Sequence, residues 1–524
     1  MTVGAFFSIL QSHLLSDRRT YQSISLLIIL FSFALRVHHL GARSLWFDES
    51  VEYWVASAPL SQILSAAKTA LQDPPLYSLL LHVWRYAGHA EFSIRFLSVA
   101  FSVLGVLGTL SLARIALGRT ESLIAGLLIA VSIPNVRFGQ EAGQYALMSC
   151  LLIWNLVFLY LLVKRQAWRW SVLWVISGVA AIYSYYGTML TIGATTLVCV
   201  VYLIAQRRHD QLRRLVVSAG IMGLLSVPLA VEWMPVQLFR SATAGAFKLV
   251  MGTSQEELHR WAMQTKSLLI FMLLGYQKNN WPWPQLQEWV LWLPLVFLVL
   301  IGTIRKRYRL LISWLLIGSL VYYLVGRAGA YPYGGRYALI LEPLLWCAVA
   351  AGISVLASRL VWSIRGFVVV VILSAFVALG LLAPIEAQED LRTAARFWSA
   401  HRQTGEATYV YYGAVPGFRY QIALAGYPEA LPPLWYMDCW QGEPFDYCNE
   451  GGIHYGRWIR NLAPEAKVQA LLDATGDATQ RLWLIFSHIY GDEDQTILTA
   501  LNPTYRVVMR HSTENSAAIL LERQ

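Results

Sequence analysis

The sequence predicts a polytopic α-helical membrane protein with a soluble C-terminal α/β domain, and three observations support this fold class. Of 524 residues, 56% are hydrophobic and only 14% are charged, whereas a soluble domain carries about a quarter charged residues. Uncharged runs of roughly 20 residues, the length that crosses a bilayer as a helix, recur along the chain. After Pro384 the long apolar runs stop, and short alternating helical and strand patterns begin.

Basic residues gather in six short clusters between the apolar runs, as the positive-inside rule expects of cytoplasmic loops. This pattern explains the net charge of +10 better than nucleic-acid binding does. If all six clusters are cytoplasmic, an even number of crossings separates each from the next. The resulting prediction is about 11 transmembrane helices, with the N-terminus inside: 21–40, 95–113, 120–136, 145–163, 170–187, 188–206, 215–233, 286–304, 310–326, 337–357 and 366–384.

The segment 74–88 is apolar but is not counted as a crossing. It is short, opens with Pro74 and Pro75, and contains His82 and Arg85. Counting it would place the later basic clusters outside, so an interfacial or re-entrant helix is the consistent interpretation. The first outer loop is then 41–92, and the other large outer segments are 134–144, 234–285 and 327–336.

The predicted domains are therefore a transmembrane domain, 1–384, and an extracytoplasmic α/β domain, 385–524. In the latter we expect helices at 389–401 and 464–475 and strands at 408–412, 481–487, 506–510 and 517–522. It has no phosphate-binding glycine loop and no catalytic-triad pattern, which favours recognition or packing over chemistry. Whether Cys439 and Cys448 form a disulfide is left open.

The most informative motif is Trp46-Phe47-Asp48-Glu49, directly after the first apolar run. Carboxylates are costly near hydrocarbon, so two of them at the membrane surface indicate a function. Neighbouring side chains diverge by about 100° on a helix and point to opposite faces of a strand. Asp48 and Glu49 are therefore expected to have separate roles, one as a general base and the other as a metal ligand or structural partner. The alternative is a pair of ordinary loop carboxylates, with Trp46 and Phe47 as interfacial anchors.

Two other outer loops add candidates. Arg137 and Glu141 lie in the second loop, where Glu141 is equally explained as a favourable charge at a helix N-terminus. Arg336 and Tyr337 open a late span; a guanidinium suits phosphate, although a lone interfacial arginine is also a common snorkelling anchor. Asp73, before Pro74, is a weaker candidate.

Together these motifs resemble the GT-C glycosyltransferases that use polyprenyl-phosphate sugars, such as the protein O-mannosyltransferases and the lipid A aminoarabinose transferases. The resemblance depends on four motifs in register: Trp46 to Glu49, Asp73 to Tyr77, Gly139 to Tyr145, and Arg336-Tyr337. The chain departs from the family pattern in two places. Asp73 stands where a histidine is usual, and Gly143 where an arginine is usual.

The resemblance implies a GT-C fold and an inverting transfer of a sugar to a lipid, glycan or protein acceptor on the extracytoplasmic face of the inner or plasma membrane. It implies Asp48 as general base with Glu49 beside it, and a donor phosphate bound by Arg336, Tyr337 and Arg137. A divalent metal ion is a candidate cofactor, with Glu49, Asp73 and Glu141 as candidate ligands. No nucleic-acid partner is expected.

Two other function classes remain as alternatives. A transporter or flippase of a lipid-linked or anionic solute would place ionisable residues near the bilayer midplane, and a non-catalytic envelope-assembly scaffold would need no carboxylate cluster. The sequence identifies neither the sugar, hexosyl or pentosyl, nor the acceptor, the metal requirement or the oligomeric state.

Overall fold

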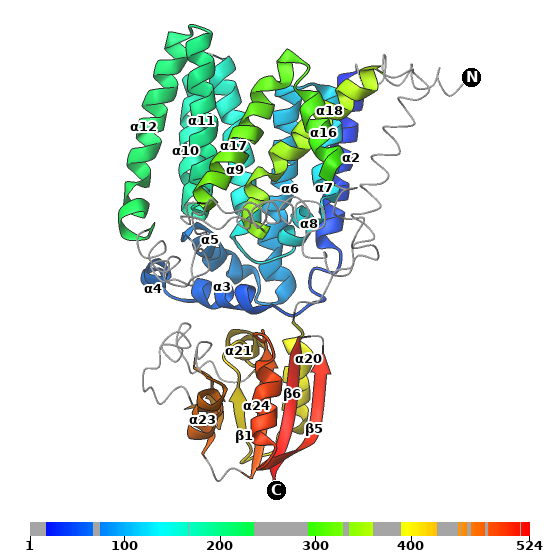
Figure 1. Ribbon diagram of the computed structural model, residues 1–524, viewed down its shortest axis with the longest axis vertical. Helices are drawn as coiled ribbons and strands as arrows, with labels where there is room; N and C mark the ends of the chain where they lie inside the picture. The colour runs from blue at the N-terminus through cyan, green and yellow to red at the C-terminus, as the bar shows by residue number, and fades with distance from the viewer. Residues whose placement is uncertain are drawn as a thin grey trace, which may run out of the picture. The chain divides into compact units, whose positions relative to one another are not determined.

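The computed structural model describes most of the chain (Figure 1): residues 17–66, 74–165, 167–234, 292–327, 335–359, 389–426, 449–450, 452–457, 463–476, 480–513 and 515–524. The chain divides into two compact units. The first takes Met1–His38, Leu64–Tyr77 and Phe96–Pro384, and the second takes His39–Ile63, Ser78–Arg95 and Ile385–Gln524.

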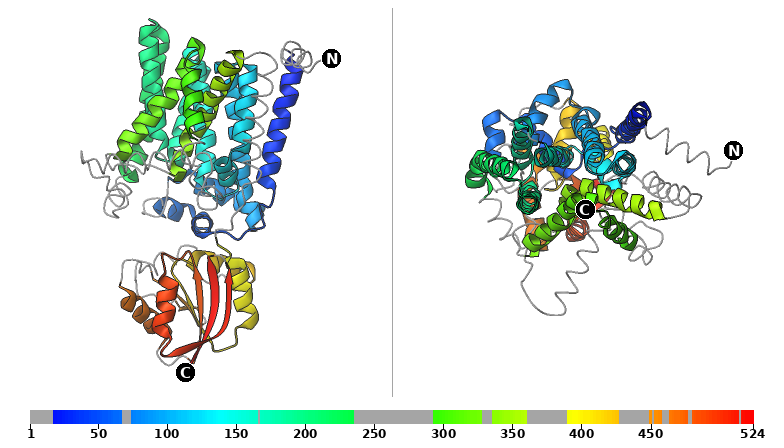
Figure 2. Two further views of the ribbon diagram at one scale, coloured as in Figure 1. Left: turned by 45° about the vertical axis from the view of Figure 1, so that its right-hand side comes forward. Right: turned by 90° about the horizontal axis from the view of Figure 1, so that it is seen from above.

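The first unit is a bundle of apolar helices that lie side by side in all three views (Figures 1 and 2). Its short 3₁₀ turns are η4 (Lys306–Tyr308) and η5 (Gly335–Leu341). Its helices are α2 (Arg18–Val37), α6 (Glu91–Ala116, from Phe96 on), α7 (Arg119–Val131), α8 (Ile133–Gly139), α9 (Gln144–Lys164), α10 (Trp168–Ser184), α11 (Thr188–Ala205), α12 (His209–Glu232), α16 (Trp292–Gly302), α17 (Arg309–Arg327) and α18 (Glu342–Arg359).

Within the described residues, seven helices are long and apolar enough to cross a membrane, or up to eight if the bent pair α7 and α8 is one span. The pair bends by 59° at Ser132, and Pro134 lies in the first turn of the second helix. The predicted spans 170–187 and 286–304 coincide with α10 and α16, whose described lengths of 17 and 11 residues are shorter than a full crossing. The span 366–384 lies outside the described residues, so the number eleven stays a prediction.

The segment 74–88 forms α5 (Leu76–Trp84), nine residues long, followed by the 3₁₀ turn η2 (Arg85–Ala87). Nine residues rise about 14 Å as a helix, less than half of the hydrocarbon core of about 30 Å. Its His82 Nδ1 lies 2.8 Å from the carbonyl oxygen of Ala56. A short helix fastened in this way does not cross a bilayer by itself.

Glycine permits a close helix contact in the bundle. A Cβ at position 352 in α18 would lie 2.0 Å from the carbonyl oxygen of Leu298 in α16. The two helices therefore pack backbone against backbone there, and any side chain at position 352 would push them apart.

Among its described residues, the second unit contains a six-stranded sheet (Figure 2). The strand order is β2-β3-β1-β4-β6-β5. β1 pairs in parallel with β3 and β4, and the other pairs are antiparallel. The strands are β1 (Ala407–Val410), β2 (Asn449–Glu450), β3 (Ile453–Tyr455), β4 (Arg481–Ser487), β5 (Tyr505–Thr513) and β6 (Ser516–Arg523). The predicted strands correspond to β1, β4, β5 and β6.

Helices α20 (Leu391–His401), α21 (Val415–Leu424), α23 (Pro464–Thr475) and α24 (Glu493–Leu501) accompany the sheet. The predicted helices correspond to α20 and α23, whereas α21 and α24 were not predicted. Helix α3 (Phe47–Ser57), from the predicted first outer loop, belongs to the same compact unit. Its Trp54 indole N–H donates to the carbonyl oxygen of Pro416 in α21 at 3.0 Å, so this part of the loop packs against the C-terminal region. Helix α4 (Leu60–Ala66) follows it.

Candidate functional site

Asp48 and Glu49 occupy the first turn of α3. Acidic residues are favourable there because the first backbone N–H groups of a helix carry partial positive charge. The Glu49 carboxylate also accepts the backbone N–H of Trp46 at 3.2 Å, which satisfies one of the unpaired donors at the helix start. The motif therefore starts a helix as well as supplying carboxylates.

Glu49 is buried, with 1% of its surface exposed, and it pairs with Arg95 at the start of α6. The Arg95 Nε and Nη2 atoms donate to the two carboxylate oxygens of Glu49 at 2.8 and 2.6 Å. This two-point geometry is the strong form of an ion pair. Both carboxylate oxygens of Glu49 thus accept hydrogen bonds from Arg95. These contacts are those of a structural residue.

Arg95 also holds the chain that leads into α3. Its Nη atoms donate to the carbonyl oxygens of Leu40, Arg43 and Ser44 at 2.8 to 3.0 Å. A single guanidinium therefore fixes both the start of α3 and the segment 40–44 that leads into it.

On the other side of Asp48, Phe47 is held from the C-terminal region. The backbone N–H of Phe47 donates to Glu389 Oε2 at 3.0 Å, and Glu389 Oε1 lies 2.6 Å from Nδ1 of His488. The Phe47 ring stacks on the His488 ring at 4.5 Å. Burial raises the pKa of the Glu389 carboxyl against the opposing effects of His488 and the Phe47 amide, and the nearby charge of Asp48 raises it further. Asp48 itself is half-buried. Both of its neighbours in the chain, Phe47 and Glu49, are held by hydrogen bonds.

His488 lies where β4 ends, beside the end of its parallel neighbour β1. Ligands of open α/β sheets bind at this carboxyl edge of parallel strands. Tyrosine hydroxyls gather there on Glu493: those of Tyr411 and Tyr412 donate to its carboxylate at 2.7 and 2.9 Å. Lys467 Nζ lies 2.7 Å from the same carboxylate. Hydrogen bonds from Lys467 and the tyrosines outweigh burial and lower the pKa of Glu493.

In the first unit, Arg336 lies among aromatic side chains of its own and of other segments. Its guanidinium carbon is 5.3 Å from the ring centre of Tyr145 and 5.8 Å from that of Tyr337, which is cation–π geometry. Tyr337 in turn stacks on Tyr185 at 6.4 Å, and Tyr145 meets Phe138 at 5.0 Å. The structure thus brings Arg336 together with the second outer loop and with the turn at Tyr185.

A buried polar network lies behind this aromatic cluster. Arg36, in the last turn of α2 and fully buried, donates to Ser102 Oγ, to Asn135 Oδ1 and to the carbonyl oxygen of Ala130 at 2.6, 2.6 and 3.0 Å. Glu342, the first residue of α18, accepts from Asn135 Nδ2 at 3.4 Å and also from Ser132 and Trp346. The network joins α2, α6, α7, α8 and α18 where α7 and α8 bend.

Gln140 fastens the second outer loop to the end of α2. Its amide nitrogen donates to the carbonyl oxygens of Leu35, Arg36 and His38 at 2.9 to 3.2 Å, which are among the carbonyls that a helix end leaves unpaired. The backbone beside Glu141 is therefore fixed, and Glu141 itself is buried. Arg137 is half-buried in the last turn of α8.

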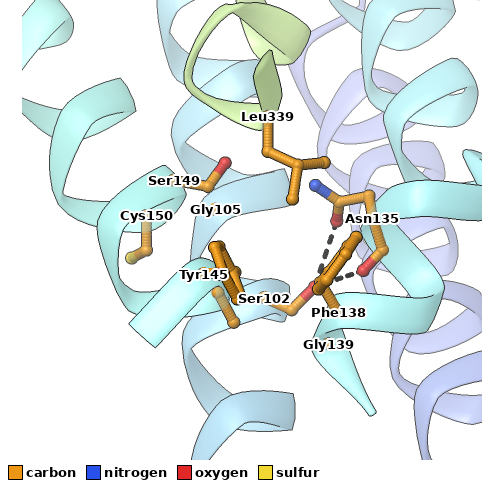
Figure 3. A pocket seen from close by; sticks show the side chains of 10 residues that line it. Ser102, Gly105, Asn135, Phe138, Gly139, Tyr145, Ser149, Cys150 and Leu339 are labelled. Carbon is orange, nitrogen blue, oxygen red and sulfur yellow. Dashed lines mark hydrogen bonds between the residues drawn. The ribbon is translucent and has the colours of Figure 1, made fainter. Parts of the chain in front are cut away.

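A small cavity lies between these elements (Figure 3). Figure 3 shows Asn135 and Ser102 joined by a hydrogen bond on one side of it and Tyr145 on another. Asn135 belongs to the polar network and Tyr145 to the cluster around Arg336, so both line the same space. Its lining residues are Ser102, Gly105, Asn135, Phe138, Gly139, Tyr145, Ala146, Ser149, Cys150 and Leu339.

The candidate metal ligands do not form a cation site in the part of the chain that the structure describes. No group of three or more His, Cys, Asp or Glu side chains there is arranged to hold a metal ion. Glu49 is neutralised by Arg95, and Asp73 lies outside the described residues. A divalent ion stays a candidate cofactor, and no chemical step is assigned to one.

Five residues of these networks were not predicted from the sequence: Arg36, Arg95, Glu342, Glu389 and His488. The first three carried a usable signal, because a charged residue at the end of an apolar helix needs a partner once it is buried. The pairing of Glu389 with Phe47 carried no such signal, because 342 positions separate them in the chain.

Part of the first half of the chain matches the model of a protein family. Residues 72–233 match the family model described as dolichyl-phosphate-mannose-protein mannosyltransferase. No curated protein sequence matches the chain significantly.

Solved structures match almost the whole chain at low sequence identity. ArnT from Cupriavidus metallidurans, bound to undecaprenyl phosphate, is 13% identical, with a TM-score of 0.53 over 94% of this chain and 97% of that chain. The Archaeoglobus fulgidus oligosaccharyltransferase is 12% identical, with a TM-score of 0.53 over 96% of this chain and 74% of that chain. At such identity the likeness shows the fold. The predicted GT-C fold, a polytopic helical membrane protein with a soluble domain, is confirmed, as is the resemblance to GT-C glycosyltransferases.

Proposed function

We propose that the chain is an inverting glycosyltransferase that moves a sugar from a polyprenyl-phosphate donor to an envelope acceptor on the extracytoplasmic face. Three findings support the proposal: the GT-C fold, the family match over residues 72–233, and relatives whose structures hold undecaprenyl phosphate or dolichol-phosphate. A hexosyl or pentosyl group would fit the proposed chemistry equally, and the acceptor would be a lipid, a glycan or a protein.

The observation that carries the proposal is the first turn of α3. Glu49 and Phe47 are each held by buried partners, Arg95 and Glu389, and the half-buried Asp48 stands between them. A general base must be held at one geometry within hydrogen-bond reach of the proton that it abstracts. The surroundings of Asp48 meet this requirement. Glu49, bonded to Arg95, is the structural partner that holds Asp48 in position.

The reaction that we assign is a displacement at the anomeric carbon. Asp48 accepts the proton of an acceptor hydroxyl, and that oxygen forms the new bond to the anomeric carbon as the bond to the phosphate oxygen breaks. The electron pair of the broken bond leaves with the polyprenyl phosphate. Attack on the face opposite the leaving group inverts the configuration, and positive charge develops on the sugar ring in the transition state, as in glycoside hydrolysis.

The departing phosphate needs a cation at the depth of the lipid headgroups, because the polyprenyl tail stays in the bilayer. We assign this role to Arg336, with Tyr337 beside it and Arg137 as a second cation. A guanidinium presents two parallel donors to a phosphate. The rings of Tyr145 and Tyr337 around Arg336 fix its orientation, which disfavours a snorkelling anchor. Glu141 stays a weaker candidate in the same loop.

Within this proposal, 1–384 with its outer loop 41–92 is the transmembrane catalytic domain and 385–524 is an extracytoplasmic domain that supports the loop. The transporter alternative is disfavoured by the position of charge. In the described apolar helices, every Asp, Glu, Lys and Arg lies within the first or last two turns. A transport pathway would place such residues near the bilayer midplane.

The experiment that tests the proposal compares cells with and without the chain by mass spectrometry of envelope glycolipids and glycoproteins. We expect one class of conjugate to lose a mass equal to a single sugar when the chain is absent, while a polyprenyl-phosphate sugar of that mass accumulates. An unchanged envelope, with no accumulated donor, would contradict the proposal.

A further inference from the structure

Two residues far along the chain fix the start of the helix that carries Asp48. Glu389 Oε2 accepts the backbone N–H of Phe47 at 3.0 Å, one of the donors that a helix start leaves unpaired. The Ser44 hydroxyl donates to the backbone carbonyl of Glu389 at 2.6 Å. Glu389 is thus bonded to Ser44, just before α3, and to Phe47, its first residue. Its side chain is buried.

His488 completes the arrangement and has an unusual backbone. Its Nδ1 lies 2.6 Å from Glu389 Oε1 and its Nε2 lies 3.1 Å from the Tyr490 hydroxyl, so both ring nitrogens have partners. Its φ is 50°, which is uncommon for a residue other than glycine. Residues held in this region cluster at functional sites. Here the conformation places the imidazole at the end of β4, under the Phe47 ring, with the ring planes 17° apart.

We infer that Glu389 and His488 are positioning residues for Asp48. They act through the backbone and the ring of Phe47, the residue directly before the proposed base, and they are absent from the motifs that identified the site. The inference rests on the proposed function of Asp48. It assigns to the C-terminal region an indirect part in catalysis: residues at the carboxyl edge of its parallel strands orient the base through Phe47.

This role predicts a separation between transfer and donor binding. A shift of about 1 Å at a reacting group costs up to about 100-fold in rate, whereas the donor phosphate is assigned to Arg336 in the other unit. Loss of the Glu389 carboxylate should therefore lower sugar transfer and leave the binding of undecaprenyl phosphate, used as a probe, within about twofold.

The experiment uses the full chain in lipid nanodiscs, with two graded variants and one control. Glu389→Ala removes the two hydrogen bonds of the carboxylate, to the Phe47 backbone N–H and to His488. His488→Asn keeps a donor at the Nδ1 position and tolerates positive φ, but it loses the ring stack. The control is Glu522→Gln, which removes the charge from an exposed ion pair with Arg506 in the same unit.

Three readouts are compared: hydrogen–deuterium exchange of the peptide spanning 44–57, undecaprenyl phosphate binding, and the sugar conjugate identified by the envelope comparison. In Glu389→Ala we expect exchange at Phe47 to rise about tenfold, as for loss of a hydrogen bond to a charged group. Transfer should fall about 10- to 100-fold, and probe binding should be unchanged. His488→Asn should retain more transfer than Glu389→Ala, and Glu522→Gln should match the wild type.

Unchanged exchange in the 44–57 peptide of Glu389→Ala would overturn the inference, because the helix start would then not depend on Glu389. Faster exchange with normal transfer would also overturn it, because the contact would then not serve catalysis. Failure of the proposed function gives a different pattern: Asp48→Asn would itself transfer sugar normally, while the exchange measurement would still decide whether Glu389 holds the helix.

Discussion

Removing the guanidinium that neutralises Glu49 should destabilise the unit that contains α3. Arg95→Met keeps the approximate length of the side chain, and it leaves the Glu49 carboxylate buried without its counter-charge. Breaking a buried ion pair by removing one partner costs about 3–5 kcal/mol. For a domain of about 150–250 residues, each kcal/mol lowers Tm by about 2–4 °C. We therefore expect Tm of the full chain in detergent, followed by tryptophan fluorescence, to fall by roughly 6–20 °C.

The second variant and the control make this prediction specific to the pair. Glu49→Gln should cost less, because Arg95 keeps its bonds to the carbonyl oxygens of Leu40, Arg43 and Ser44. The double variant should lose less than the sum of the single losses, because neither charge is then left alone. Arg506→Met, at an exposed ion pair, should cost no more than about 1 kcal/mol. A Tm of Arg95→Met within about 2 °C of wild type, or strict additivity in the double variant, would refute the reasoning.

Three further predictions concern the base, the donor site and pH. Asp48→Asn should lower transfer by about 10²-fold or more and keep undecaprenyl phosphate binding; transfer near the wild-type rate would exclude Asp48 as the base. Arg336→Lys should weaken binding of that lipid and Arg336→Ala should weaken it further, because lysine keeps the charge but loses the paired donors; equal binding by all three proteins would remove Arg336 from the donor site. Glu493, whose pKa in the fold is lowered chiefly by hydrogen bonds from Lys467 and two tyrosines, stabilises the protein above its unfolded pKa, and this contribution is lost as pH falls through the folded pKa. Tm should therefore depend less on pH below about 4.5 in Glu493→Gln than in the wild type, and identical pH profiles would contradict this.

The sequence predicts those elements that local patterns determine. The apolar runs predict α2, α9 and α11 because each run alone is long enough to cross a bilayer. The run at 481–487 predicts β4, which is buried over six of its seven residues. The first-turn carboxylates Asp48 and Glu49 could be located because an acidic pair beside an apolar run is unusual, whatever the rest of the chain does.

Local patterns do not predict α21 or the partners of the site. The start of α21 contains Pro416 and Gly417, which read as a turn. Proline is nevertheless well accepted in the first turn of a helix. A Cβ at Gly417 would lie 2.6 Å from Leu391, so the glycine leaves room for the Leu391 side chain. Arg95 and Glu389 reach α3 across 46 and 342 positions, a pairing that only the fold creates.

The central claim is that a sugar leaves its polyprenyl phosphate by a transfer that needs Asp48. The most direct measurement supplies the purified chain, in lipid vesicles, with the polyprenyl-phosphate sugar that accumulates in cells without it and with an envelope extract as acceptor. The account predicts that free polyprenyl phosphate and a glycosylated acceptor appear in equal amounts, with inverted configuration at the anomeric carbon, and that Asp48→Asn forms neither. A donor that crosses the vesicle membrane with its sugar still attached, equally well with Asp48→Asn, would contradict the account and indicate a lipid transporter.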